Sequence, residues 1–278
     1  MVRPAGYQMM VLEQSETSRL GPVFDSCRAD NRAALIGYLP TGYPDVPTSV
    51  DAMIELVESG CDIIEVGVPY SDPGMDGPTI ARATEVALRG GVRVRDTLAA
   101  VEAISQAGGR AVVMTYWNPV LRYGVCAFAR DLESAGGHGL VTPDLIPDEA
   151  RQWIAASEKH RLDRIFLVAP SSTPHRLVTT VGASRGFVYA VSVMGVTGAR
   201  DAVSQVVPEL VARVKAVSDI AVGVGLGVRS REQAAQIGGY ADGVIVGSAL
   251  VSALGDGLPR LRALAEELAA GVRQRTFM

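Results

Sequence analysis

The stretch "DIIEVGVPYSDPGMDGPTIARATEVALRG", Asp62 to Gly90, contains a strand, a loop and a helix in immediate succession. Residues 62–68 form a nearly continuous apolar run, which is typical of a strand covered on both faces in a parallel sheet. Residues 77–90 have the pattern of a helix and follow a loop rich in glycine, proline and aspartate. A strand that leads through a loop into a helix is the repeating unit of α/β proteins.

Similar units recur along the whole chain. Further apolar runs predict strands at 33–39, 110–117, 139–143, 164–170, 186–193, 220–227 and 242–250. Amphipathic patterns predict helices at 46–60, 96–109, 147–160, 201–218 and 258–272, and a lead-in helix at about 15–30. Eight strand–helix units predict a single closed (β/α)8 TIM barrel with an extra N-terminal helix.

An open, doubly wound sheet is the alternative fold. Regular repeats with no marked switch point favour the closed barrel over it. No linker or low-complexity segment interrupts the pattern, so we expect one catalytic domain at 15–278. Residues 1–14 are expected to form a flexible leader.

The composition excludes several classes of partner. The chain has 278 residues, of which 48% are hydrophobic, and its net charge of −4 gives no basic surface for nucleic acid. No apolar run reaches the ~18 residues of a membrane span, and the N-terminus lacks the apolar region of a signal peptide. The three cysteines lack CxxC spacing, which indicates reduced thiols and a cytoplasmic location.

Glu65 is an acidic residue inside an apolar strand. In a barrel of this kind the active site lies at the C-terminal ends of the strands, and Glu65 falls late in its strand. Period-two alternation places it on the same face as Ile63 and Gly67. If that face points into the barrel, burial raises the pKa of Glu65 towards neutrality, which suits a general acid–base. Alternatively, Glu65 pairs with an internal arginine or faces the helices.

Two further carboxylates follow in the loop. Asp76 immediately precedes the helix at 77–90, so it is either a second functional acid or only the N-cap of that helix. Asp72 lies in "SDPG" and is compatible with a simple turn residue. The loop therefore supplies one candidate partner for Glu65.

Small residues gather at the ends of the last three strands. Glycines there let backbone N–H groups approach a phosphate, helped by the N-terminus of a short helix. Taken singly, each glycine is equally compatible with relief of packing in the strand. Taken together they predict a phosphate site without lysine or arginine, built from Gly195, Gly198, Gly225, Gly227, Gly247 and Ser248.

The positions of lysine and histidine exclude other barrel chemistries. Lys159 and Lys215 lie near helix ends, which disfavours a Schiff-base aldolase. His138, His160 and His175 do not cluster at strand ends, so we expect no metal site. What remains is a phosphate-anchored substrate that is handled by carboxylates.

Five motifs, in their order and spacing, resemble one family closely. They are "IEVGVPYSDPGMDGPTIARA", "TYWNPVLRYG", "MGVTGAR", "GVGLGV" and "DGVIVGSAL", and they resemble the tryptophan synthase α subunit from about Ser18 to the last helix. The resemblance implies a carbon–carbon lyase of tryptophan biosynthesis. Such an enzyme cleaves indole-3-glycerol phosphate by a retro-aldol reaction to indole and glyceraldehyde 3-phosphate.

The resemblance also implies roles for individual residues. Glu65 would be the proton shuttle for indole C3 and the glycerol hydroxyl, Asp76 would hold the indole N–H as a more polar, ionised carboxylate, and Tyr189 would lie near Glu65. The remaining implied positions are Tyr38, Tyr116 and Leu226 around the indole, Gly198, Gly225, Gly227, Gly247 and Ser248 around the phosphate, and Thr197 in a closing loop.

A partner subunit is implied as well. The family works with a pyridoxal-phosphate β subunit in an αββα assembly. The resemblance therefore implies that this chain itself binds no cofactor. Asp72, Asn118 and Pro119 fall in segments that would face that partner, although a buried Trp117 is equally compatible with "WNPVL".

The chain departs from the family pattern at Val193, Ala221, His138 and Thr142, none of which is a proposed reacting or phosphate-binding residue. A regulatory subunit that binds the phosphate ligand with little turnover is an alternative function, and the presence of both acids argues against it. An indole-glycerol-phosphate synthase or a pentose-phosphate epimerase would require catalytic lysines or metal-binding histidines at strand ends.

Overall fold

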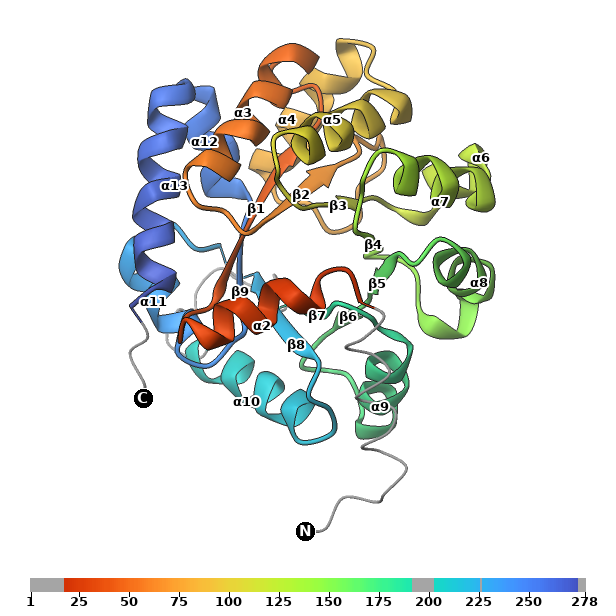
Figure 1. The fold of residues 1–278 in the computed structure, drawn as a ribbon, viewed down its shortest axis with the longest axis vertical. Coiled ribbons are helices and arrows are strands. Elements are labelled where there is room, and N and C mark those ends of the chain that lie inside the picture. The colour runs from red at the N-terminus through yellow and green to blue at the C-terminus, as the bar shows by residue number, and fades with distance from the viewer. Residues whose placement is uncertain (1–17, 192–202, 226, 275–278) are drawn as a thin grey trace.

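A barrel of parallel strands forms the centre of the computed structural model, which describes residues 18–191, 203–225 and 227–274 (Figure 1). Within these residues the strands form one sheet in the order β5-β4-β3-β2-β1-β9-β8-β7-β6. The strands are β1 (Ala34–Pro40), β2 (Ile63–Gly67), β3 (Ala111–Met114), β4 (Gly139–Val141), β5 (Asp163–Ile165), β6 (Leu167–Val168), β7 (Phe187–Val191), β8 (Ala221–Gly225) and β9 (Gly243–Val246).

Closure of the barrel occurs at a strand that is split in two. The predicted strand 164–170 forms both β5, which pairs with β4, and β6, which pairs with β7. Phe166 lies between the two parts, and its carbonyl oxygen accepts a hydrogen bond of 3.0 Å from the Tyr189 N–H. The predicted closed barrel is therefore confirmed, and the open sheet is wrong.

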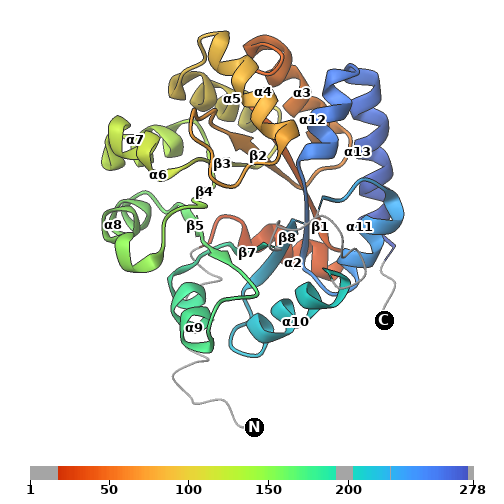
Figure 2. The same ribbon diagram turned by 180° about the vertical axis from the view of Figure 1, so that it is seen from behind.

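Helices surround the strands in both views (Figures 1 and 2). They are α2 (Gly21–Ala29), α3 (Val46–Glu58), α4 (Pro78–Arg89), α5 (Val94–Gln106), α6 (Trp117–Tyr123), α7 (Val125–Ser134), α8 (Arg151–Lys159), α9 (Pro174–Ala183), α10 (Val203–Lys215), α11 (Arg231–Gly238), α12 (Ser248–Gly255) and α13 (Leu258–Val272), with a 3-10 turn at Pro147–Glu149. No helix in the described residues is long and apolar enough to cross a membrane.

Two strands end at least three residues earlier than their apolar runs predict. The run 110–117 leaves the sheet after Met114, because α6 begins at Trp117. The run 242–250 leaves it after Val246, because α12 begins at Ser248 with Gly247 as its N-cap. Apolar runs alone do not distinguish the end of a buried strand from the first turn of the following helix.

Helices α6, α7, α9, α11 and α12 were not predicted from the sequence. Two of them begin at side-chain caps: Thr173 accepts a hydrogen bond from the Arg176 N–H, and Ser230 accepts one from the Gln233 N–H. Pro174 directly after Thr173 adds a second start signal for α9. Such caps mark helix starts even in segments with little apolar periodicity.

The barrel interior is packed and is closed at one end by α2. Its apolar residues include Ile36, Ile63 and Phe187, which pack against Phe24 of α2. The rings of Phe24 and Phe187 have centroids 5.6 Å apart. Helix α2 crosses the end of the barrel that faces the viewer in Figure 1, so the opposite end is the one open to a ligand.

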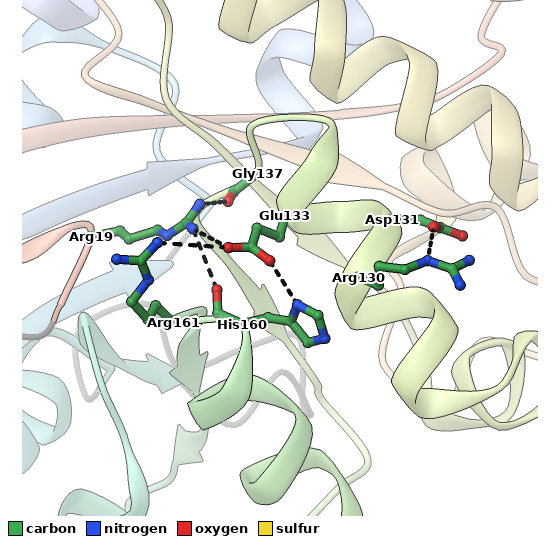
Figure 3. Close-up of polar contacts among 7 residues, drawn as sticks. All are labelled: Arg19, Arg130, Asp131, Glu133, Gly137, His160 and Arg161. Atoms are coloured by element: carbon green, nitrogen blue, oxygen red, sulfur yellow. Dashed lines mark hydrogen bonds and ion pairs between the residues drawn. The ribbon is translucent and has the colours of Figure 1, made fainter.

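A polar network fixes the segment before α2 to the base of the barrel (Figure 3). Arg19 contacts Glu133 (Nη2–Oε1, 3.3 Å), and Glu133 also contacts His160 (Oε2–Nδ1, 2.7 Å). Buried Asp163 accepts hydrogen bonds from the Leu20 N–H at 2.8 Å and the Ser18 hydroxyl at 2.9 Å. These contacts fix the segment before α2 to this end of the barrel, so we look for the functional site at the opposite end.

Candidate active site

Glu65 lies inside the barrel, which is the first of the orientations that the strand pattern allowed. In register it lies between Tyr38 of β1 and Val112 of β3, and it shares a face with the interior residue Ile63. The side chain is 0% exposed, and neither carboxyl oxygen has a hydrogen-bond partner in the described part of the chain. Among the described residues Glu65 therefore has no arginine partner, and it does not face the helices.

Desolvation controls the proton affinity of this carboxyl. Burial disfavours the ionised form and raises the pKa of Glu65 to about 8. At neutral pH the group therefore carries its proton, and a modest change in its surroundings is enough to remove it. This is the range in which a carboxyl works both as acid and as base.

Two tyrosines lie against glycines at the mouth of the barrel. An ideal Cβ on Gly67 would lie 2.5 Å from the Tyr38 Oη, and one on Gly225 would lie 2.6 Å from the Tyr189 Oη. Both phenols thus occupy space that side chains at these glycines would fill. Burial raises the pKa of Tyr38 and of Tyr189 well above the usual range. The negative charge of Glu65 raises both pKa values further. Both hydroxyls remain neutral donors.

Asp76 is held by Tyr116 and does not cap the helix. The N-cap of α4 is Gly77, and no side chain caps that end. Instead, the Tyr116 hydroxyl donates to Asp76 Oδ1 (3.3 Å) and accepts from the Met75 N–H (2.9 Å). Burial raises the pKa of Asp76, and the Tyr116 hydrogen bond opposes that rise. The expected polar surroundings of this acid are therefore found only in part.

The predicted phosphate residues that the structure describes lie at two neighbouring strand ends. Gly225 is the last residue of β8 and pairs with Ile245 of β9, so the segments that follow both strands begin side by side. Gly247 and Ser248 form the start of α12, whose first-turn N–H groups have no partner within the helix. Gly227 has a φ of +66°, a conformation that glycine adopts at little cost.

Gly195, Thr197, Gly198 and Leu226 lie outside the described residues, as do the leader 1–14 and Val193. The other predicted site residues belong to β1, β2, β7 and β8 and to the segments that follow β2, β3, β8 and β9, including the first turns of α6 and α12. The fold thus brings them to the same end of the barrel, opposite α2.

Arg229 was missed in the sequence. A cavity of about 410 Å³ lies along α12, and both Ser248 and Arg229 line it, together with Thr79 and Arg260. Arg229 follows the glycine motif by one residue, which is the signal that could have identified it. It brings positive charge close to a site that the sequence predicted to rely on backbone donors alone.

The predicted partner surface lies beside the same loops. Asp72 is exposed, and Asn118 Nδ2 donates to the Tyr70 hydroxyl at 3.3 Å. Tyr70 stacks on Tyr116 with ring centroids 5.2 Å apart. Pro119 is partly exposed on α6.

Two large apolar side chains are exposed on this surface: Met75 is 48% and Leu121 50% exposed. Trp117 is partly buried, and its backbone N–H donates to Asp144 Oδ1 at 2.8 Å. The burial expected for Trp117 is therefore only partial, and the partner-facing role of "WNPVL" stays a prediction. The described residues contain no group of three or more His, Cys, Asp or Glu side chains placed to hold a metal ion.

Comparisons with known proteins point to one family. The family model for the tryptophan synthase alpha chain matches residues 24–276. The tryptophan synthase alpha chain of Mycobacterium marinum is 84% identical over 266 residues, which is 96% of this chain and 99% of that protein.

Solved structures agree with this match. A structure of Mycobacterium tuberculosis tryptophan synthase superposes with a TM-score of 0.89 at 86% identity, covering 92% of this chain and 98% of that one. The tryptophan synthase subunit alpha of Legionella pneumophila has a TM-score of 0.84 at 30% identity, covering 92% and 98%.

Proposed function

Because the chain belongs to the tryptophan synthase alpha chain family, we propose that it cleaves indole-3-glycerol phosphate to indole and glyceraldehyde 3-phosphate. The observation that supports this reaction best is Glu65, a fully buried carboxyl inside the barrel with a pKa of about 8. It lies on the strand that leads into the Asp76 loop. A carboxyl that exchanges its proton near neutral pH is what this retro-aldol reaction needs.

The reaction requires two proton transfers. Direct cleavage of the C–C bond would leave a carbanion at indole C3, so C3 must first be protonated. Glu65, which carries its proton at neutral pH, gives it to C3 and becomes a carboxylate. That carboxylate then takes the proton of the glycerol hydroxyl. The C–C bond breaks, its electrons move to the indolenine nitrogen, and the hydroxyl oxygen becomes the aldehyde oxygen.

Asp76 supports the same step from the other side of the ring. We assign it the indole N–H, where a carboxylate stabilises the positive charge that develops on nitrogen after C3 is protonated. Tyr116 orients it, because its hydroxyl donates to Asp76 and is itself fixed by the Met75 N–H. Tyr38, Tyr189 and Leu226 complete the walls around the ring.

The phosphate anchors the substrate at the ends of β8 and β9. We assign it to the N–H groups of Gly225, Gly227, Gly247 and Ser248, with Gly198 as a further donor and Thr197 in the closing loop. Helix α12 favours an anion at its first turn through its dipole. This end of the substrate carries no reacting bond and serves to place indole C3 beside Glu65.

We further propose that the chain works with a tryptophan synthase β subunit, in tryptophan biosynthesis. Asp72, Asn118 and Pro119 lie on a surface where Met75 and Leu121 are exposed, which suits a protein partner. Pyridoxal phosphate belongs to that partner. The proposed reaction moves two protons between Glu65 and the substrate and one bond pair within the substrate, and it uses no cofactor in this chain.

Indole release from indole-3-glycerol phosphate tests the proposal, with and without a β subunit. The wild type is expected to release indole slowly alone and much faster with the partner, whereas Glu65→Gln releases none. Glu102→Gln, at an exposed position on α5, is the matched control and should retain activity. Tight binding of the ligand without any release, even with the partner, would instead indicate the regulatory function.

A further inference from the structure

Tyr38 is a buried phenol whose pKa is raised by the charges of both proposed carboxylates. It pairs in register with Glu65, but its ring leans along the strands towards the mouth, over Gly67. A Cβ on Gly67 would lie 2.5 Å from the Tyr38 Oη and 2.8 Å from Cε2 and Cζ of the ring. The hydroxyl therefore lies one interior layer above Glu65, on the side from which a ligand enters.

The charges around this hydroxyl support the same placement. After burial, the negative charges of Asp76 and Glu65 contribute most to the raised pKa of Tyr38, followed by Tyr116 and Tyr189. These groups come from β2, β7 and the loops after β2 and β3. Within the described residues, Tyr38 is thus the hydroxyl that senses both proposed acids, and it faces them as a neutral O–H donor.

Glu65 needs a polar partner that the described residues do not supply. Both of its oxygens are buried without a hydrogen bond. Buried polar atoms are almost always paired, so a polar atom of a bound ligand is the partner that this carboxyl favours. Such an atom would meet the Tyr38 hydroxyl on its other side.

We propose that the Tyr38 hydroxyl donates a hydrogen bond to the substrate oxygen that loses its proton to Glu65. This rests on the proposed cleavage reaction. As the C–C bond breaks, that oxygen passes its proton to Glu65 and becomes the aldehyde oxygen, while the bond electrons move to the indolenine nitrogen. Negative charge builds on the oxygen during the transfer, and the Tyr38 O–H stabilises it while keeping its own proton. A side chain at position 67 would clash with the phenol, and glycine avoids this clash.

Kinetics of Tyr38→Phe test the catalytic part of the proposal, in the complex with a β subunit. Loss of one donor to a developing oxyanion typically costs 10²–10³ in rate; for this partial charge we expect kcat to fall about 10- to 100-fold. KM should rise by no more than about tenfold, because only one hydrogen bond to the bound substrate is lost while the ring that forms the wall remains. Tyr240→Phe, near the opposite end of the barrel, is the matched control and should behave as wild type.

Binding separates contact with the substrate oxygen from simple packing. Two ligands are compared in Glu65→Gln, which binds without turnover: indole-3-glycerol phosphate, and indole-3-propanol phosphate, which lacks the chain hydroxyls. Adding Tyr38→Phe should weaken the first ligand about 3- to 10-fold, the range of one hydrogen bond, and leave the second unchanged. Equal weakening of both ligands would mean that Tyr38 acts by packing, and would overturn the proposal.

The remaining outcomes are also decisive. If the wild type cleaves the substrate and Tyr38→Phe matches it, the role of Tyr38 is wrong while the proposed function stands. If the wild type does not cleave the substrate, the proposed function itself fails. If Tyr38→Phe does not fold, Gly67→Ala serves instead, because its Cβ would displace the hydroxyl, and it should lower kcat while binding of the propanol ligand persists.

Discussion

Burial of the Glu65 carboxyl affects the stability of the fold as well as the chemistry. The folded protein holds this proton with a pKa of about 8, whereas an exposed glutamate has a pKa near 4.5. The stabilising effect of the proton is complete below pH 4.5 and is lost as the pH rises through 8. Above that range the fold carries a buried, unpaired charge.

Glu65→Gln should therefore stabilise the protein at alkaline pH while it abolishes activity. Relative to the wild type, we expect a gain on the order of 4 kcal/mol in the free energy of unfolding at pH 9, and little difference at pH 5. Urea denaturation of both proteins at the two pH values measures it. An equal difference at both values would mean that Glu65 is not buried as a protonated acid.

Single residues show where sequence reasoning succeeds and where it stops. Period-two alternation placed Glu65 on the same face as Ile63 and Gly67, but it could not decide whether that face points into the barrel; the structure shows that it does. The same reasoning could not show that Tyr116 holds Asp76, because the two residues come from different loops. It could not pair Tyr38 with Gly67 either, since that contact depends on the register between β1 and β2. Such contacts join residues that are far apart in the sequence, so a local sequence pattern cannot predict them.

At the scale of elements, the loop after β8 combines a glycine conformation with a proposed phosphate site. Gly227→Ala places a Cβ at a φ of +66°, where no described atom lies within 4 Å, so its cost is conformational. We expect a loss of about 1–2 kcal/mol in stability together with weaker binding of the phosphate ligand. Gly182→Ala, inside α9, is the control and should stabilise the protein by up to about 1 kcal/mol. Thermal unfolding and ligand titration of both variants test this, and a Gly227→Ala protein that matches wild type in both would refute it.

Helix α2 acts as the floor of the barrel. Phe24 is 3% exposed and contacts Phe187, so Phe24→Ala leaves a cavity in the interior. We expect a loss of about 3–5 kcal/mol in the free energy of unfolding, measured by urea denaturation. A loss below about 1 kcal/mol would show that α2 does not close the core. The sequence predicted this helix, but not its position across the barrel end.

Element boundaries were the least predictable part of the fold. The apolar runs identified every strand, although one of them is split at Phe166 and two continue into helices. The short helices α6 and α12 were missed because their apolar residues continue the preceding strand pattern. Their starts are set by backbone geometry, such as Gly247 at the N-cap of α12.

At the scale of the whole molecule, we expect a substitution on the proposed interface to reduce activation by the β subunit, and one on a distant surface to leave it unchanged. Leu121 is 50% exposed beside the proposed interface, and Val178 is 56% exposed on α9. Leu121→Asp should leave folding and slow indole release intact but reduce activation by the β subunit at least tenfold, because charge at an interface core is costly. Val178→Asp should change neither. Activation that survives Leu121→Asp would move the interface elsewhere.

The barrel as a whole was predictable because its repeats are regular and most strands are apolar on both faces. The site was predictable to the extent that a barrel gathers strand ends at one face. Arg229 and the Asp76–Tyr116 contact required the structure, because charge and hydrogen bonding between loops depend on how neighbouring strands align.

The pH dependence of kcat/KM for indole release tests the central claim most directly, since it reports the pKa of the essential group in the free enzyme. If Glu65 supplies the first proton, kcat/KM should fall above an apparent pKa near 8 and stay level below it until Asp76 takes up a proton at acid pH, and Glu65→Gln should show no activity at any pH. A rate that rises through pH 8, or that persists in Glu65→Gln, would contradict the account.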